Sequence, residues 1–253
     1  MSLGFIGTGR ITSALVEGLC TAKDPPENVL VSPRNAENAA RLAARFSRVS
    51  VAVSNQAVIE SCDCTFLAVV PQVARSVLKD LCFRTDQTVI SLVPTIPIDE
   101  VRKLVDPVKS VVRAVPLPTV SQHLGPIPLY PKISQAVEIF DKLGKPIPLQ
   151  NEKELNILWT VTALIAPIYA LMEETCQWAI ACGVNRQNAG AYIASMFHAV
   201  SAVIKDLPDV RFSDLEAEAA TPGGFNEQAL SVIREGGGYK AFLNALNSVH
   251  TRH

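Results

Sequence analysis

The sequence has no excess of basic residues: its 23 lysines and arginines are balanced by 24 acidic residues, which gives a formal net charge of −1. Proteins that bind nucleic acids need a basic surface to neutralise phosphates. The four histidines form no ligand cluster, and the spacing of Cys62 and Cys64 is not that of a zinc site or of a thioredoxin-like dithiol. We therefore expect neither a nucleic-acid partner nor a structural metal.

A secretory leader is also missing ahead of Gly4, and the six cysteines lie mostly within apolar runs. We expect free thiols in the reducing environment of the cytoplasm. What the sequence does have is length and apolar content. Its 253 residues, 48% of them hydrophobic, are able to bury a large core and are enough for two domains.

One uncharged stretch, Leu155–Met172, is long enough to span a membrane. It contains polar side chains such as Asn156 and Thr160 as well as Pro167, and no basic residues mark a cytoplasmic flank. A helix buried on all sides, in a core or in a subunit interface, explains this stretch better than a membrane span. We expect no membrane partner.

The sequence pattern changes near residue 150. Up to Leu149, short β-branched runs alternate with helical patterns, which indicates βαβ units and a parallel sheet. Strands are expected at Ser2–Ile6, Val29–Ser32, Ser50–Val53, Cys64–Val70, Gln87–Val93, Val108–Val115 and Ile127–Tyr130, and helices at Ile11–Cys20, Ala36–Phe46, Asn55–Glu60, Pro71–Leu81, Ile98–Leu104 and Ile133–Leu143. Residues 1–149 are therefore predicted to form an α/β Rossmann-type, doubly wound nucleotide-binding domain with extra strands appended.

After residue 150 the β-branched runs stop, and long helical patterns cover Glu152–Cys182, Asn185–Lys205 and Asn226–Glu235. Several of these helices have apolar faces that are too wide for one small domain to cover. Residues 150–253 are therefore predicted to form an all-α domain that pairs with another subunit.

A glycine-rich motif, G-F-I-G-T-G-R-I-T, occupies residues 4–12 between the first expected strand and the first expected helix. In a dinucleotide-binding unit, Gly7 would make the tight turn and Gly9 would let a diphosphate approach the start of the helix. The third position of the motif is Thr12 rather than Gly or Ala, so the strand–turn–helix context carries the prediction. An ordinary glycine-rich turn is the alternative. The expected cofactor contacts here are Gly7, Thr8, Gly9, Arg10 and Ile11.

The second strand ends in Ser32-Pro33-Arg34-Asn35, without the carboxylate that usually binds the ribose hydroxyls of NAD. Ser32 is able to donate a hydrogen bond, and the planar guanidinium of Arg34 is suited to a 2′-phosphate. The expected cofactor is NADPH, with NADH possible. Further cofactor contacts are expected at Asn55, Val69, Val70 and Pro71; Pro71 taken alone is better explained as the first residue of a helix.

A second glycine motif, Thr221-Pro222-Gly223-Gly224-Phe225-Asn226, precedes a helix for which Asn226 is the expected N-cap and Gly236 the expected stop. Consecutive glycines before a helix expose backbone amides, and these amides favour a small carboxylate. A flexible turn with a good cap is the alternative.

These motifs occur in the order and rough spacing of the pyrroline-5-carboxylate reductases, which the whole chain resembles. Val70-Pro71-Gln72, Arg113 with Pro116, and Pro167-Ile168-Tyr169 belong to the same pattern. The resemblance implies an N-terminal domain that holds NADPH or NADH and a helical domain that interlocks two subunits, in a dimer or a ring of dimers. It also implies a cyclic imine whose carboxylate lies on the Pro-Gly-Gly loop and which is reduced to proline.

Several residues depart from the family pattern at the expected pocket. Val115–Thr119 lacks the family's asparagine, Ala163–Ala166 is more apolar than usual, and Val70 replaces a lysine. Phe225 and Asn226 replace a small residue and a threonine. Together these departures predict a remodelled pocket.

We therefore expect an NADPH-dependent reductase of a cyclic imine carboxylate, most simply pyrroline-5-carboxylate. Its expected substrate contacts are Pro222, Gly223, Gly224 and Phe225, and its candidate catalytic hydrogen-bonding groups are Thr221 and Asn226. A reductase of another small imino or keto acid and a catalytically silent NADP-binding sensor are the alternatives.

Overall fold

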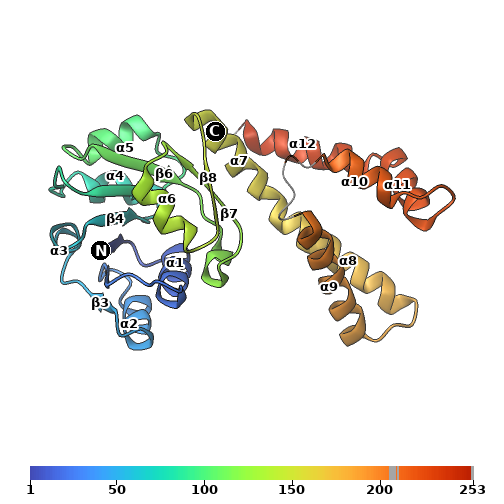
Figure 1. The fold of residues 1–253 in the computed structure, drawn as a ribbon, viewed down its shortest axis with the longest axis horizontal. Helices are drawn as coiled ribbons and strands as arrows, with labels where there is room; N and C mark the ends of the chain where they lie inside the picture. Colours follow the sequence, from blue (N-terminus) through green and yellow to red (C-terminus); the bar gives the residue numbers. More distant parts are fainter. Residues whose placement is uncertain (205–208, 210, 252–253) are drawn as a thin grey trace. The chain divides into compact units, whose positions relative to one another are not determined.

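A computed structural model describes residues 1–204, 209 and 211–251. The chain forms two compact units, Met1–Trp159 and Thr160–His253 (Figure 1). The passage from one unit to the other lies inside a run of helix, about ten residues after the change of sequence pattern at residue 150.

The first unit contains one eight-stranded sheet with the order β3-β2-β1-β4-β5-β6-β7-β8. Its strands are β1 (Ser2–Ile6), β2 (Asn28–Val31), β3 (Val49–Val51), β4 (Cys64–Leu67), β5 (Thr88–Ser91), β6 (Ser110–Ala114), β7 (Pro126–Tyr130) and β8 (Lys145–Pro148). Strands β1 to β6 are parallel, whereas β7 runs antiparallel to β6 and β8 runs parallel to β7. The predicted Rossmann-type fold is confirmed.

Strand β8 was not expected from the sequence. Pro146 and Pro148 alternate along it, and proline cannot donate a backbone hydrogen bond. The strand forms nonetheless because it is at the edge of the sheet, where one side of its backbone needs no partner. Strands β4 and β5 are shorter than predicted, because the apolar runs continue beyond the residues that pair in the sheet.

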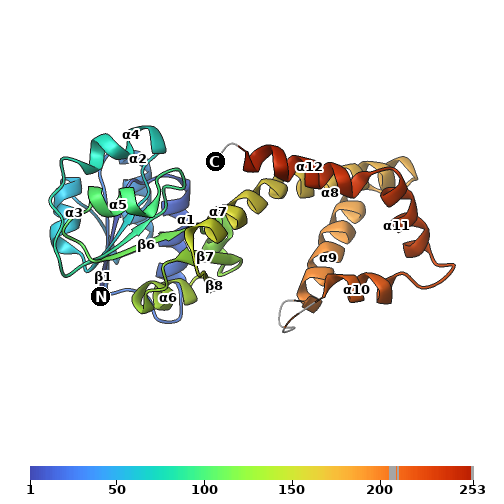
Figure 2. The ribbon, with the colours of Figure 1, turned by 90° about the horizontal axis from the view of Figure 1, so that it is seen from above.

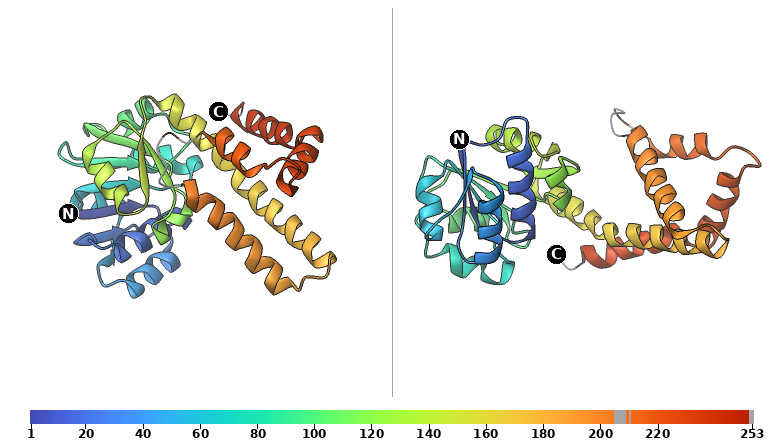
Figure 3. Two further views of the ribbon diagram at one scale, coloured as in Figure 1. Left: turned by 45° about the vertical axis from the view of Figure 1, so that its right-hand side comes forward. Right: turned by 90° about the horizontal axis from the view of Figure 1, so that it is seen from below.

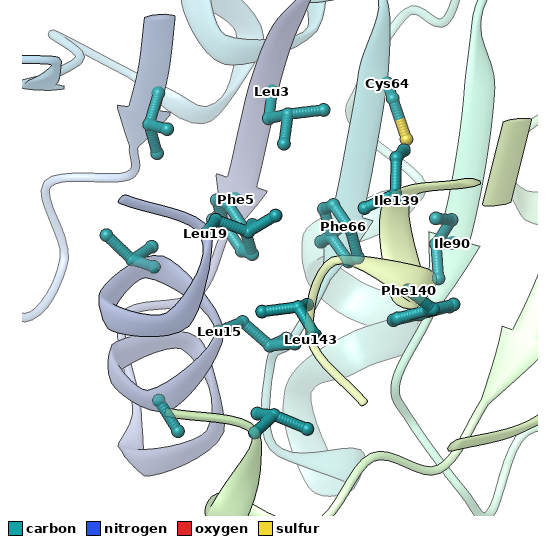
Figure 4. Packing of buried hydrophobic residues seen from close by; sticks show 14 of the residues in the cluster. Leu3, Phe5, Leu15, Leu19, Cys64, Phe66, Ile90, Ile139, Phe140 and Leu143 are labelled. Atoms are coloured by element: carbon teal, nitrogen blue, oxygen red, sulfur yellow. The ribbon is translucent and has the colours of Figure 1, made fainter. Parts of the chain in front are cut away.

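Helices cover both faces of the sheet, as in a doubly wound fold. One face carries α1 (Arg10–Thr21), α2 (Ala36–Arg45), α6 (Ser134–Asp141) and the short 3-10 helix η1 (Pro118–Gln122); the other carries α3 (Asn55–Ser61), α4 (Pro71–Leu78) and α5 (Ile98–Leu104). In the first layer Phe5 of β1 stacks on Phe66 of β4 with ring centroids 4.6 Å apart, and Phe140 of α6 meets Phe66 edge-on (Figure 4). These rings pack β1 and β4 against the helices beside the turn that follows β1.

The second unit is helical throughout the part of it that the structure describes. Helix α7 (Glu152–Val161) continues through a 3-10 turn, η2 (Thr162–Leu164), into α8 (Ile165–Ala181), which α9 (Arg186–Ile204), α10 (Phe212–Ala219), α11 (Phe225–Glu235) and α12 (Gly238–His250) follow (Figure 2). The predicted long helices are present, although Lys205 lies outside the described residues; α10 and α12 were not expected.

Helices α8 and α9 form a hairpin, the yellow and orange pair in Figure 3. Its small core contains Cys176, Ala189 and Ile193. Within the run Glu152–Ala181, only 11% of the most apolar 18-residue window is buried inside the chain, and Cys176 is the one buried residue of α8. A helix buried in the core of its own chain is therefore the wrong explanation for the long apolar stretch. Of the two explanations that the sequence offered, burial in a subunit interface remains.

Candidate functional site

The expected cofactor residues lie on four loops at one edge of the sheet. Gly7–Ile11 follows β1, Ser32 and Arg34 follow β2, Asn55 follows β3, and Val69–Pro71 follows β4. These four strands are neighbours, and the chain passes from β1 to β2 on one side and reaches β4 on the other. Ligands of open α/β sheets bind outside the carboxyl ends of the strands at such a switch point.

The two glycines of the turn after β1 differ in why they are glycine. The fold requires glycine at Gly7, whereas the space beside Gly9 is open. Gly7 has a φ of +102°, and a Cβ there would lie 2.4 Å from the carbonyl oxygen of Ala68. Gly9 has an ordinary φ of −82°, and a Cβ there would have no protein atom within 4 Å. The protein alone does not require glycine at Gly9. A side chain there would fill the space through which a diphosphate approaches the first turn of α1, so the residues fit a dinucleotide.

Three side chains hold this turn. The amide of Gly7 donates to Ser32 Oγ at 2.8 Å, and Thr12 Oγ1 donates to the carbonyl oxygen of Gly7 at 2.7 Å. Asn38 Nδ2 donates to the carbonyl oxygen of Thr8 at 3.0 Å. Ser32 and Thr12 are buried. Neither Thr12 nor Asn38 was expected to serve the site, because a motif shows which residues are near a ligand but not which backbone groups they hold.

The remaining cofactor candidates are at the ends of helices. Pro71 is the first residue of α4 and Val70 is its exposed N-cap, so the structural explanation of Pro71 is correct and remains compatible with a role beside a ligand. Asn55 is the first residue of α3, whose cap is Ser54. Arg34 is exposed.

The Pro-Gly-Gly loop (Thr221–Gly224) is a β-turn in which the amide of Gly224 donates to the carbonyl oxygen of Thr221 at 2.9 Å. Gly223 has a φ of +74°, which the third position of a type II turn demands, and proline is common before it. The prediction that Asn226 is the N-cap of α11 is wrong. The N-cap is Gly224, whose backbone is extended where the turn ends. The Asn226 side chain instead donates through Nδ2 to the carbonyl oxygen of Ala219 at 3.2 Å. The expected stop at Gly236 is confirmed.

All three amides of this loop are already engaged, since the Thr221 amide donates to the carbonyl oxygen of Ala219 at 3.1 Å and the Gly224 amide donates to Thr221. The amide of Gly223 donates to the Glu227 carboxylate at 2.7 Å. Glu227 comes three residues after the true cap, the spacing of a capping box, so placing the cap at Gly224 would have revealed it. Phe225, at the start of α11, is 92% exposed. The amides that stay available for a ligand are therefore those of the first turn of α11, next to the negative charge of Glu227 and the exposed ring of Phe225.

A buried cation lies near the end of β6. Arg113 is 2% exposed, and its guanidinium donates to the Glu152 carboxylate and to the carbonyl oxygen of Pro94. The amide of Ile98 donates to the same carboxylate at 2.6 Å. Because its charge is paired, Arg113 ties β6 to the start of α7 rather than offering a free cation to a ligand.

Thiol chemistry is not favoured at Cys62 and Cys64. Burial raises the pKa of the Cys62 thiol to about 11 and raises that of Cys64 further, so both stay protonated at neutral pH. All six cysteines are unpaired. Among the described residues, no group of three metal-ligating side chains comes together.

Two family models match the chain. "NADP oxidoreductase coenzyme F420-dependent" matches residues 2–95, and "Pyrroline-5-carboxylate reductase dimerisation" matches residues 152–253. The chain belongs to the pyrroline-5-carboxylate reductase family. The resemblance inferred from its motifs is thereby confirmed. The second match shows that the helical half corresponds to the dimerisation region of this family.

Relatives match the chain over nearly its whole length. Pyrroline-5-carboxylate reductase 3 of Xenopus laevis is 26% identical over 100% of this chain and 94% of its own, and the enzyme of Methanosarcina acetivorans is 26% identical over 96% and 93%. Among solved structures, the Plasmodium falciparum reductase with NADP bound has a TM-score of 0.85 at 20% identity, covering 100% of this chain and 96% of its own. The Coxiella burnetii reductase has a TM-score of 0.85 at 23% identity, covering 99% and 96%. These structures share the fold.

Substitution of the two glycines should separate folding from cofactor binding. Gly7→Ala should lower the free energy of unfolding by about 3 kcal/mol, because positive φ and a clash with backbone both oppose a side chain. Gly9→Ala should lower it by about 1 kcal/mol or less, yet weaken NADPH binding at least tenfold, on the order of 1.4 kcal/mol. Chemical denaturation and calorimetry measure the two effects. Wild-type NADPH affinity in Gly9→Ala would contradict the assignment of the turn.

Proposed function

We propose that the chain reduces a cyclic imine carboxylate with NADPH, pyrroline-5-carboxylate to proline being the leading reaction, and that NADH serves less well. The open space at Gly9, in a chain of this family, is the observation that carries the proposal. Residues 1–149 form the NADP(H)-binding domain of this proposal, and residues 150–253 the substrate-binding and dimerisation domain.

At the sheet edge, the amides of the turn from Thr8 to Ile11 bind the diphosphate with the positive end of α1 behind them. The Arg34 guanidinium binds the 2′-phosphate, with no carboxylate among residues 32–35 to repel it. Val70 and Pro71 border the nicotinamide ribose. The bound nicotinamide supplies a hydride, and the reaction requires the imine carbon within about 3 to 3.5 Å of it.

At the Pro-Gly-Gly loop, the amides at the start of α11 bind the substrate carboxylate. An imine nitrogen is readily protonated before or during binding, so this end of the site would need no strong general acid. The Thr221 hydroxyl is the better hydrogen-bond group for the substrate, because the Asn226 side chain already donates to Ala219. Pro222, Gly223, Gly224 and Phe225 shape this end of the site.

A second candidate, a reductase of another small imino or keto acid, is supported by Phe225. Its exposed ring adds apolar surface at the loop, which favours a substrate with a larger apolar part than the pyrroline ring. Assays with different imines decide between the two candidates.

The helical domain forms a homodimer in this proposal, alone or within a ring of dimers. Large apolar side chains are exposed along its helices, more than a free monomer commonly shows. They include Tyr169, Leu171, Trp178, Tyr192, Met196, Val200, Val203, Phe212, Val232, Ile233, Tyr239 and Leu243. A second copy is the occupant that fits, because the family's dimerisation model covers these helices.

The run Glu152–Ala181 is long and apolar enough to cross a membrane by length and composition alone. We propose that a second subunit, not lipid, covers it, since Asn156, Thr160, Thr162 and Pro167 interrupt the apolar stretch of the sequence. We accordingly propose that the enzyme acts in the cytoplasm.

Purified protein should oxidise NADPH when pyrroline-5-carboxylate is added. Arg34→Ala should raise the KM for NADPH tenfold or more and leave the KM for NADH little changed, because only NADPH carries the phosphate that the guanidinium binds. Absorbance of the reduced cofactor measures both, and Arg41→Ala, which removes an exposed arginine paired with Glu17, is the control. No oxidation at saturating imine excludes the activity, and NADPH binding without turnover of any cyclic imine supports a silent sensor.

Glu227→Gln should lower the KM for pyrroline-5-carboxylate about fivefold at unchanged kcat. The glutamine oxygen still accepts from the Gly223 amide, while about 1 kcal/mol of repulsion between two nearby charges is removed. The KM for 1-pyrroline, which lacks the carboxylate, should stay the same. Glu235→Gln, at the other end of α11, is the matched control. An equal change for both imines would argue against a carboxylate on this loop.

Size-exclusion chromatography with light scattering should give a mass of at least twice that of one chain. Val200→Asp should shift this mass towards the monomer, because Val200 is 66% exposed in the single subunit and a dimer interface would bury it. Leu124→Asp, at an exposed apolar residue of the first unit, should leave the mass unchanged. A monomeric wild-type protein contradicts the proposed assembly.

A further inference from the structure

We infer that Ser32, Thr12 and Asn38 are positioning residues that hold the diphosphate-binding turn in its bound shape before the cofactor arrives. They act through the backbone of Gly7 and Thr8 rather than by touching the nucleotide. The inference rests on the proposed NADP(H) binding at this turn and assigns Ser32 a different task from a direct contact with the 2′-phosphate.

Ser32 fixes the peptide that enters Gly7. It is 1% exposed, and its amide donates to the carbonyl oxygen of Phe5 at 2.9 Å, which fastens it to β1. Its hydroxyl oxygen accepts from the Gly7 amide at 2.8 Å. A side chain so enclosed, with its oxygen engaged by the turn, is placed to hold backbone rather than to meet a phosphate in solvent.

Thr12 fixes the peptide that leaves Gly7. It is fully buried on α1 and donates to the Gly7 carbonyl oxygen at 2.7 Å. The Gly7–Thr8 peptide is trans, so its N–H points away from its C=O. Drawing the carbonyl towards Thr12 therefore turns the Thr8 amide away from α1. A glycine or alanine at this third position of the motif has no hydroxyl with which to do so.

Asn38 repeats this arrangement one residue further along. Its side-chain amide donates to the Thr8 carbonyl oxygen at 3.0 Å, and by the same trans geometry the Gly9 amide points away from α2. Two successive amides are thus aimed by side chains of α1 and α2, next to the open space at Gly9. Preorganised donors bind an anion more tightly than donors that must first be ordered.

Calorimetry of both cofactors tests the inference. Ser32→Ala, Thr12→Val and Asn38→Ala should each weaken NADPH and NADH about tenfold and by the same factor, because the diphosphate is common to both. Thr12→Ser, which keeps the hydroxyl, should stay within about twofold of wild type. In turnover, the KM for NADPH should rise while kcat at saturating NADPH is retained.

Thr65→Val is the matched control. It removes a buried hydroxyl of β4 that accepts from Gln87 Nε2 at 3.3 Å, so it should lower the Tm without changing either affinity. Asn38 is only partly buried, so Asn38→Ala should fold and tests the inference even if Thr12→Val does not fold.

Two results would overturn the inference. Unchanged affinities for both cofactors in Ser32→Ala and Asn38→Ala would mean that the turn keeps its shape without these side chains. Weaker binding of NADPH but not of NADH in Ser32→Ala would mean that Ser32 contacts the 2′-phosphate directly. A wild-type protein that binds neither cofactor instead overturns the proposed function, so the two failures are distinct.

Discussion

The close approach of Gly7 to the carbonyl oxygen of Ala68 determines how the chain leaves β1 and enters α1. A side chain at this point would force β1 and the end of β4 apart, and those strands stack the Phe5 and Phe66 rings behind the turn. With the approach in place, α1 begins at the switch point of the sheet and directs its amides outward. The cofactor edge is thus a consequence of core packing.

Local sequence patterns predicted the fold where they agreed with tertiary structure. Strand–helix alternation placed the seven strands from β1 to β7, because buried parallel strands are dense in β-branched residues. It failed at β8, where Pro146 and Pro148 suit only an edge, and a strand's position in the sheet is not encoded locally. Helix α10 was missed because no capping side chain marks its start. Helix α12 was missed because it starts at Gly237 and Gly238, residues that are typical of a helix end.

The candidate site was predictable in its residues but less so in their directions. The sequence located the turn at Gly7 and the loop at Gly223, since both need glycine at positive φ. It did not reveal that Ser32 faces the backbone, because the direction of that side chain depends on the packing of the neighbouring strand. It did not reveal that Glu227 engages the loop, because that contact depends on which residue caps α11. The pairing of Arg113 with Glu152 joins residues far apart in the chain, beyond the reach of any local pattern.

The short segment between β2 and α2 carries two tasks at once. Arg34 lies between Ser32, which holds Gly7, and Asn35, whose side chain caps α2. Asn38, three residues after Asn35, holds Thr8. The preference for one coenzyme and the affinity for the diphosphate that both coenzymes share consequently depend on the same stretch, residues 32–38. An engineer who exchanges this stretch to convert the protein from one coenzyme to the other would also loosen its hold on both, unless the serine and the second asparagine are carried across.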